Sequence, residues 1–551
     1  MLALLCVLLS PCALPQQKDT SGNPNDDPVL QAMREEIERS KNYLKLDHVA
    51  APYYIEYRIF DVDDYTAEAS FGALRSQLRS RSRILHVSVR VGDYRQDGVS
   101  GQGERTLNVG DLMPVDNDTI ALRHQLWLAT DRAFKEAAEA LAAKQAQLKQ
   151  FTIDQPVDDF ARAEPVHSVG PLVRLDIDPQ SFNRMLEDAS AVFKTDSQTQ
   201  ASDSNLRFQA MNRYLANSEG TAVRDGRLLY QMFLSCSTQA GDGMSLQRSQ
   251  GFVTEKVTEL PSAAAFVGRA SDMMKSLQSL RAAPLVEEEY RGPVLFSADA
   301  STTIFAQLIG DNVVGNRPEL GKTTRTTGPF ATSYKSRVLP EFLSVVDDPT
   351  ISTYRGHSLL GHYEVDDEGV PAQRVQVIEN GTLKNYLIGR EPIRDFPASN
   401  GHARARLPGP LPGLTHPLPH TGNLIVSASQ TLTGEQIRNR FMELCRQRDL
   451  PYCYRVETFG PKLAPRLLYK VWTKDGHEEL VRGGSFGDLD VRSLRSSLIA
   501  AGDDVYIDDL PLNVPHSIAA PSVLFDDLEI KLATSDRGKL PEYSAPPLAG
   551  K

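Results

Sequence analysis

The sequence has little positive charge, few cysteines and no long apolar run, and each shortage excludes a class of protein. Its 60 lysine and arginine residues are outnumbered by 71 acidic residues, which gives a formal net charge of -11. Nucleic acid is therefore an unfavourable partner, because phosphate binding needs a positive surface. The apolar run at residues 2–9 is much shorter than the about 20 residues of a membrane-spanning helix, so we predict no transmembrane segment in the mature chain.

Cysteine is too sparse for a disulfide scaffold or a thiolate metal site. Two of the five cysteines, Cys6 and Cys12, fall within the first 16 residues. Cys236, Cys445 and Cys453 have no metal-ligand spacing. Cys445 and Cys453 are eight residues apart, and the sequence leaves open a disulfide in an oxidising compartment or two buried thiols.

The N-terminal segment predicts export to the periplasm or secretion. Residues 2–9 (LALLCVLL) are apolar, and the first charge is Lys18, which is typical of a signal peptide, although a positive n-region is missing. We expect a signal peptide at 1–16 and a polar linker at 17–26. A lipoprotein anchor at Cys12 is an alternative that Pro11 disfavours.

A chain of 551 residues exceeds one ordinary hydrophobic core, so two domains are expected. Asp27-Pro28 predicts the start of a helix. Apolar and polar residues alternate over 53–59 and 85–91, as in strands, and apolar residues recur at helical spacing over 119–148 and 263–280. Proline and a glutamate run interrupt the pattern at 281–292, and strands dominate beyond it. We predict an α+β fold with an N-terminal α/β domain at 27–285, a β-rich C-terminal domain at 286–541 and a tail at 542–551.

Local signals are strongest in the second half. Asn380-Gly381 predicts a hairpin turn between residues 373–378 and 383–388, and Asp475-Gly476 predicts another between 467–473 and 479–481. Thr433 and Gln436 have capping-box spacing and predict a helix over 434–448. Two segments are predicted to lie at the surface. The basic run at 75–83 is expected to be a solvated loop or a sheet edge, and the Pro/Gly-rich stretch at 407–415 is expected to be a loop.

Six segments in a fixed order carry a resemblance to a known family. They are 127–131 (WLATD), 217–221 (NSEGT), 338–349 (VLPEFLSVVDDP), 363–373 (YEVDDEGVPAQ), 399–402 (SNGH) and 480–484 (LVRGG). Together they resemble the TldD/PmbA family, also called modulators of DNA gyrase, from about Trp127 to Leu532. The resemblance implies an N-terminal α/β domain, a β-rich C-terminal domain, and a homodimer or a heterodimer with a TldD-like relative. It also implies that active members are zinc peptidases acting on unfolded peptides, whereas the PmbA branch lacks the metal motif.

The zinc motif of that family is degenerate in this sequence. Active members carry His-Glu-x-x-x-His on a helix, together with a distant cysteine. The matching stretch is 305–316 (FAQLIGDNVVGN), which places Ala306 and Asp311 at the two histidines, Gln307 at the glutamate and Ile507 near the cysteine. A methyl group, an amide and one carboxylate cannot hold a zinc ion and activate its water. We therefore expect no metal and no cofactor, although the family implies zinc, and the catalytic residues are unknown.

Other side chains are candidates to replace the missing zinc ligands and general base. Asn400 and His402, next to the Pro/Gly loop, are the predicted substrate-binding residues, with a purely structural role as the alternative. The prolines between His416 and His420 exclude a shared helix face. A divalent ion could bind at His357 and His362, beside the acidic residues Asp366, Asp367 and Glu368. Two further candidates are the hairpin residue His477 and a serine nucleophile, Ser485, in the motif Gly483-Gly484-Ser485-Phe486-Gly487.

The function expected from these residues is that of a catalytically silent relative. Such a pseudoenzyme would bind peptide, for example as a strand added to a sheet edge, or would pair with an active relative. Two alternatives stay open. One is an active metallopeptidase that hydrolyses unfolded peptides with non-standard ligands, and the other is a non-enzymatic envelope structural protein.

Overall fold

A computed structural model of the chain describes residues 27–99, 111–150, 157–406, 416–511, 514–534 and 537–543. The predicted signal peptide and linker, the loop at 407–415 and most of the predicted tail lie outside the described residues. Within the described ranges, no helix is both long and apolar enough to cross a bilayer.

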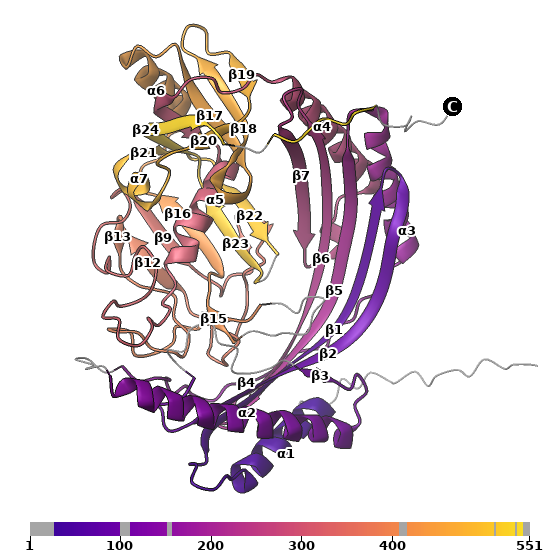
Figure 1. The fold of residues 1–551 in the computed structure, drawn as a ribbon, viewed down its shortest axis with the longest axis vertical. Helices are drawn as coiled ribbons and strands as arrows, with labels where there is room; N and C mark the ends of the chain where they lie inside the picture. Colours follow the sequence, from indigo (N-terminus) through magenta and orange to yellow (C-terminus); the bar gives the residue numbers. More distant parts are fainter. Residues whose placement is uncertain are drawn as a thin grey trace, which may run out of the picture.

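The first half of the chain is built around one strongly curved sheet (Figure 1). Its strand order is β3-β2-β1-β5-β6-β4, with β7 also paired to β6. The two-residue turn at Phe71-Gly72, with φ of 45° and 73°, joins the long strands β1 and β2 in the manner of a tight hairpin. The strands are β1 (Pro52–Ser70), β2 (Ala73–Val91), β3 (Asp111–Met113), β4 (His167–Val169), β5 (Ala201–Asn217), β6 (Ala222–Gln239) and β7 (Ser245–Thr254).

Four helices cover one face of this sheet in two groups. One hydrophobic core lies between the sheet and α1 and α2, and a second lies between the sheet and α3 and α4. Figure 1 shows α1 and α2 at one end of the curved sheet and α3 and α4 at the other. Asp27 caps α1 by accepting from Val29 N and Leu30 N, which confirms the predicted helix start. The helices are α1 (Pro28–Tyr43), α2 (Thr119–Leu148), α3 (Pro179–Ala191) and α4 (Ala263–Ala282).

The second half contains two further sheets around one shared hydrophobic core. The first has the order β13-β12-β9-β16-β23-β22, and the second has the order β19-β18-β17-β8-β24-β20, with β21 also paired to β24. The strands of the first are β9 (Leu343–Asp347), β12 (Val375–Glu379), β13 (Thr382–Leu383), β16 (Asn423–Ala428), β22 (Tyr506–Leu510) and β23 (His516–Ala520). Those of the second are β8 (Tyr290–Phe296), β17 (Tyr452–Phe459), β18 (Pro465–Trp472), β19 (Glu478–Val481), β20 (Gly484–Phe486), β21 (Leu498–Ala501) and β24 (Val523–Leu532).

Three helices and two short strand pairs complete the second half. Thr433 and Gln436 form the predicted capping box at the start of α6, and Cys445 of this helix is disulfide-bonded to Cys453 of β17. Of the two states that the sequence left open for these cysteines, the structure has the bonded one. The elements are α5 (Ala298–Leu308), α6 (Gly434–Gln447), α7 (Val491–Ser496), β10 (Thr353–Tyr354), β11 (His357–Ser358), β14 (Ala403–Arg404) and β15 (Leu418–Pro419).

Most local predictions are confirmed, and together they give the expected mixed α+β fold. Asn380 and Gly381 have φ of 45° and 73° and turn β12 into β13, and β18 and β19 form the second predicted hairpin. Of the two settings predicted for the basic run at 75–83, the structure has the sheet edge, because the run belongs to β2 and its residues 76–82 pair only with β1 among the described strands. Its side chains stay largely exposed there, and Arg79 and Arg81 pair with aspartates of β1.

Candidate functional site

The helix that corresponds to the zinc-binding helix of the family is α5. It begins at Ser297, whose hydroxyl accepts from Ala300 N at 3.1 Å, and it buries Ile304 and Phe305 in the core of the second half. The helix ends at Leu308, because the side chain of Asn312 donates to the carbonyls of Gln307 and Leu308 at 3.0 and 3.3 Å.

Ala306 and Gln307 lie on the last turn of α5, but Asp311 does not belong to the helix. Asp311 lies in the following 3-10 turn, Gly310–Asn312, and is exposed. The expectation that all three motif positions share one helix is therefore wrong, since the α-helix stops three residues before Asp311. Although the residue as a whole is exposed, neighbouring protein groups partly shield its carboxyl from water, and this desolvation raises the pKa of Asp311.

The strand that holds the position of the family cysteine lies beside this helix. β22 and β23 pack against α5, and Ile507 is the second residue of β22 (Figure 1). The chain thus brings together the two elements that the resemblance assigns to the metal site, although they are about 200 residues apart in the sequence.

The side chains at these positions do not fit a zinc ion. Zinc takes imidazole, thiolate or carboxylate ligands at about 2.0–2.3 Å. Ala306 and Ile507 have no donor atom, and Gln307 offers a neutral amide. Throughout the ranges that the structure describes, no three His, Cys, Asp or Glu side chains converge in a way that could hold a metal ion.

A pair of carboxyl groups lies on α5 and β22, and sequence reasoning missed it. Burial, together with the negative charges of Asp299 and Asp509, raises the pKa of Asp508 to about 6. Burial also raises the pKa of Asp299 to about 6, with a further contribution from Glu457. The charge of Asp299 on α5 therefore acts on Asp508 across the contact with β22. No sequence pattern indicates that these two residues interact, because only the packing of the two elements makes them neighbours.

The predicted substrate-binding residues, Asn400 and His402, belong to a buried hydrogen-bond network. The ring of His402 is fully buried, and its Nε2 lies 3.1 Å from Asp347 Oδ1. Its Nδ1 lies 2.9 Å from the carbonyl oxygen of Asn400, whose side chain bonds the backbone of Tyr386 and Ile388. Both nitrogens of His402 already have partners, which favours the structural role that was the alternative for this residue.

The other candidate histidines are dispersed over the second half. His357 lies 2.6 Å from Asp509, and this ion pair raises the pKa of His357. His416 lies 3.3 Å from Glu391, and the ring of His420 contacts that of His516, with ring centroids 4.9 Å apart. His477 bonds its hairpin neighbour Asp475 at 2.8 Å.

No catalytic partner of the serine in the Gly483–Gly487 motif is found in the part of the chain that the structure describes. Ser485 lies within β20, paired with β24, rather than on a turn between a strand and a helix. Its hydroxyl donates to the Lys531 carbonyl at 3.3 Å. A nucleophile elbow needs a sharp, exposed turn, and the strand geometry is incompatible with one.

Buried charges form part of the contact between the two halves of the molecule, beside an apolar cluster of Leu215, Val223 and Val365. Arg213 of β5 donates to the carbonyls of Asp366 and Val365 at 3.0 and 2.9 Å and pairs with Asp367. Although burial raises the pKa of Asp367, Arg213 and Arg404 lower it to about 2. Arg390 donates to the Ala161 carbonyl at 2.7 Å and pairs with Glu219 at 2.8 Å. The Asp366 carbonyl and the Asp367 carboxylate thus join the halves, whereas Glu368 accepts from Arg390 N within the second half. Among the described residues, these carboxylates form no metal-binding group with His357 and His362.

Comparisons with known proteins agree with this architecture. The PmbA/TldA metallopeptidase C-terminal domain family matches residues 289–443. A metalloprotease of Methanocaldococcus jannaschii is 25% identical over 212 residues, which cover 38% of this chain and 42% of that protein. A TldD-homologous metalloprotease of Buchnera aphidicola is 30% identical over 106 residues, which cover 19% of this chain and 21% of that protein. The matched region thus spans less than half the length of these relatives.

Solved structures extend the likeness to the whole fold. TldE from Thermococcus kodakarensis matches 91% of this chain and 99% of its own, with a TM-score of 0.55 and 14% identity. A modulator of a DNA gyrase from Thermotoga maritima matches 91% of this chain and all of its own, with a TM-score of 0.58 and 15% identity. The ordered sequence segments, the matched C-terminal domain and the shared fold lead to one conclusion: the chain belongs to the TldD/PmbA family.

Proposed function

We propose that this metallopeptidase-like chain is a non-catalytic member of its family that binds peptide or pairs with a TldD-like relative. The observation that carries the proposal is the chemistry of the contact between α5 and β22. There, Ala306, Gln307 and Ile507 stand where the family resemblance places two ligands and the general base of a zinc peptidase. These side chains can neither hold the metal nor accept the proton of its water.

Retention of the fold supports a binding role. The chain keeps the whole family architecture, as its 91% coverage in the match to TldE indicates, although the α5 positions have lost their donors. A protein that loses a metal site while keeping the surrounding fold retains the surfaces that contact peptide or a partner subunit.

Zinc content tests the proposal directly. We expect the parent protein, purified without chelator, to carry well under about 0.1 zinc per chain in elemental analysis. A variant with Ala306→His, Gln307→Glu, Asp311→His and Ile507→Cys should bind about one zinc per chain, because α5 and β22 already lie side by side. The single variant Ala306→His is the control and should bind none, since one ligand is insufficient.

Two results would contradict the proposal. Stoichiometric zinc in the parent that a chelator removes would mean that a metal site exists with other ligands. Failure of the fourfold variant to bind zinc while it stays folded would mean that α5 and β22 do not form the ancestral site.

An activity assay separates the remaining functions. We expect no cleavage of unfolded casein by the parent, but co-purification with a relative that carries the zinc motif. Cleavage that a chelator abolishes would favour the active metallopeptidase with non-standard ligands. Absence of cleavage, of peptide binding and of a partner would favour the structural envelope protein.

We also propose that the protein is exported. The apolar run at residues 2–9 and the bonded pair Cys445–Cys453 support this proposal, because disulfides persist in oxidising compartments. The mass of the mature chain, measured on protein from the periplasm or medium, should correspond to removal of about 16 residues. A full-length chain found only in the cytoplasm would contradict it.

A further inference from the structure

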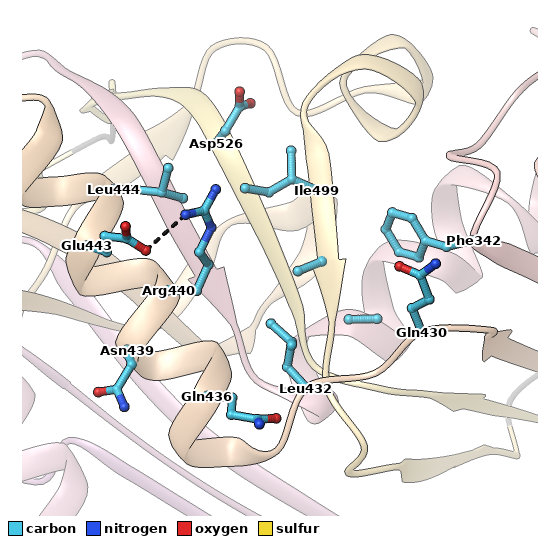
Figure 2. A pocket seen from close by; sticks show the side chains of 12 residues that line it. Phe342, Gln430, Leu432, Gln436, Asn439, Arg440, Glu443, Leu444, Ile499 and Asp526 are labelled. Carbon is cyan, nitrogen blue, oxygen red and sulfur yellow. Dashed lines mark hydrogen bonds and ion pairs between the residues drawn. The ribbon is translucent and has the colours of Figure 1, made fainter.

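An open groove of about 790 Å³ lies between α6 and the strand β21, and none of its lining residues belongs to α5. Figure 2 shows α6 along one side of the groove and the strand that carries Ile499 along the other. Its volume is within the range of ligand-binding pockets. The residues that line it are Phe342, Gln430, Leu432, Gln436, Asn439, Arg440, Glu443, Leu444, Ile499, Ala500, Ala501 and Asp526.

The strand at this groove has one free edge. β21 pairs with β24 on one side, and no strand in the described part of the chain pairs with its other side. Backbone groups on the free edge of a strand form hydrogen bonds with another extended chain when one is available. A sheet edge within a groove is therefore suited to an extended polypeptide more than to a lipid or a compact small molecule.

The chain itself shows that this edge accepts an extended backbone. Leu432 forms a parallel bridge at the end of β21, where its N–H donates to the Ala501 carbonyl at 2.9 Å. Its own carbonyl accepts from Asp503 N, also at 2.9 Å. This bridge occupies only one end of the edge, and the stretch alongside Leu498–Ala500 has no such neighbour among the described residues.

The walls and rim of the groove have the mixed chemistry that a peptide requires. Ile499 and Leu444 offer apolar surface to side chains that point inward (Figure 2). Gln430 and Asn439 on the rim are exposed, and no hydrogen bond of their side chains is found among the described residues. Arg440 is paired with Glu443 at 2.9 Å, so the rim has no excess positive charge that would favour phosphate groups.

We propose that the groove between α6 and β21 binds an extended segment of another polypeptide, which adds as a strand to the free edge of β21. The segment lies beside Leu498–Ala500 and continues the pairing that Leu432 begins. Its alternate side chains point toward Ile499 and Leu444, and the amides of Gln430 and Asn439 bond polar groups at its margins. This site rests on the proposed function, since it gives the peptide or partner a place to bind. It involves neither α5 nor the zinc positions, so the peptide test below and the zinc test above can fail independently.

The test uses the full chain and a fluorescent peptide of alternating valine and threonine with a lysine at each end. Binding is measured by fluorescence anisotropy, and the same peptide with N-methyl groups on alternate residues is the matched probe. We expect saturable binding below about 1 mM for the first peptide and at least about tenfold weaker binding for the second, because N-methylation removes the N–H donors that a strand needs.

Two variants on α6 locate the site. Asn439→Trp places a large side chain in the groove from an exposed helix position and should weaken binding at least about tenfold. Arg446→Trp is the matched control, because Arg446 is exposed on the same helix but does not line the groove. The affinity of this variant for the unmethylated peptide should change by less than about twofold.

Each contrary result overturns the proposal. No binding of the unmethylated peptide up to about 1 mM, or equal binding of both peptides, would exclude strand addition. Unchanged binding by folded Asn439→Trp would place the peptide elsewhere. A concentration-dependent dimer of the parent that Asn439→Trp abolishes, seen by sedimentation velocity, would show that a second copy covers the groove instead.

Discussion

At the scale of single residues, the structure depends on charges that are buried but paired. Arg213 is 7% exposed, and it links β5 to the loop at 365–367 by two hydrogen bonds to carbonyls and an ion pair with Asp367. Breaking a buried pair leaves the partner charge uncompensated in a low-dielectric environment. The contact between the two halves should therefore be sensitive to this one side chain.

We expect Arg213→Met to lower the free energy of unfolding by about 3 kcal/mol. The loss should be measured by denaturant unfolding, together with faster proteolytic cleavage near residues 365–367. Arg75→Met is the control, because Arg75 is 58% exposed in its pair with Glu68, and the change should be within about 1 kcal/mol. Equal losses in the two variants would argue against a special role for the buried pair.

The carboxyl pair on α5 and β22 makes a prediction about pH. The pKa of Asp508 is raised to about 6 in the folded protein and is near 3.9 in an unfolded chain. A raised carboxyl pKa means that the folded state binds the proton more tightly, so this stabilisation is present below about pH 4 and is lost as pH rises through about 6.

Asp508→Asn should therefore be more stable than the parent at pH 7, by roughly 1–2 kcal/mol, and equally stable near pH 4. Thermal or denaturant unfolding between these values measures the difference. Asp503→Asn, at an exposed position just before β22, should leave the pH dependence of the parent unchanged. A variant less stable than the parent at pH 7 would show that the Asp508 charge is stabilised in the folded protein.

At the scale of elements, local sequence signals determined most helix ends and hairpin turns. Asn380-Gly381 adopts the two positive φ values that a tight turn requires, and Thr433 with Gln436 closes the capping box of α6. The end of α5 could not be predicted in this way, because Asn312 caps it from beyond the helix. For the basic run at 75–83 the sequence left a loop and a sheet edge open, because only the backbone pairing of β2 with β1 makes it a strand.

The bond between α6 and β17 gives a prediction at this scale. We expect reduction of Cys445–Cys453 to lower the free energy of unfolding by about 2–3 kcal/mol, since the bond closes a loop of eight residues. Unfolding of the oxidised protein with and without reductant measures this effect. A double variant, Cys445→Ser with Cys453→Ser, should not respond to reductant, and an equally insensitive parent would contradict the prediction.

At the scale of the whole molecule, the curved sheet and the β-rich half meet through buried charges and through small apolar contacts, such as that of Leu215 and Val223 with Val365. The hydrophobic clusters of the first half lie mainly between the sheet and its helices, whereas Arg213 and Arg390 reach across to the second half. Residues 213 and 367 are far apart in the sequence, so no local sequence pattern predicts their pairing. Two segments of the family resemblance, 217–221 and 363–373, nevertheless contain Glu219 and Asp367, the acidic partners in these contacts.

The sequence by itself determined the family, the α+β composition, the start of α1 and the loss of donor atoms at Ala306, Gln307 and Ile507. These properties follow from residue identity and from patterns within a few residues of each other. Only the tertiary structure decided that α5 faces β22, that Asp299 and Asp508 interact, that His402 is buried against Asp347, and that β21 has a free edge in a groove. Burial, pKa and strand pairing arise from segments distant in the chain, and they exist only once those segments pack together.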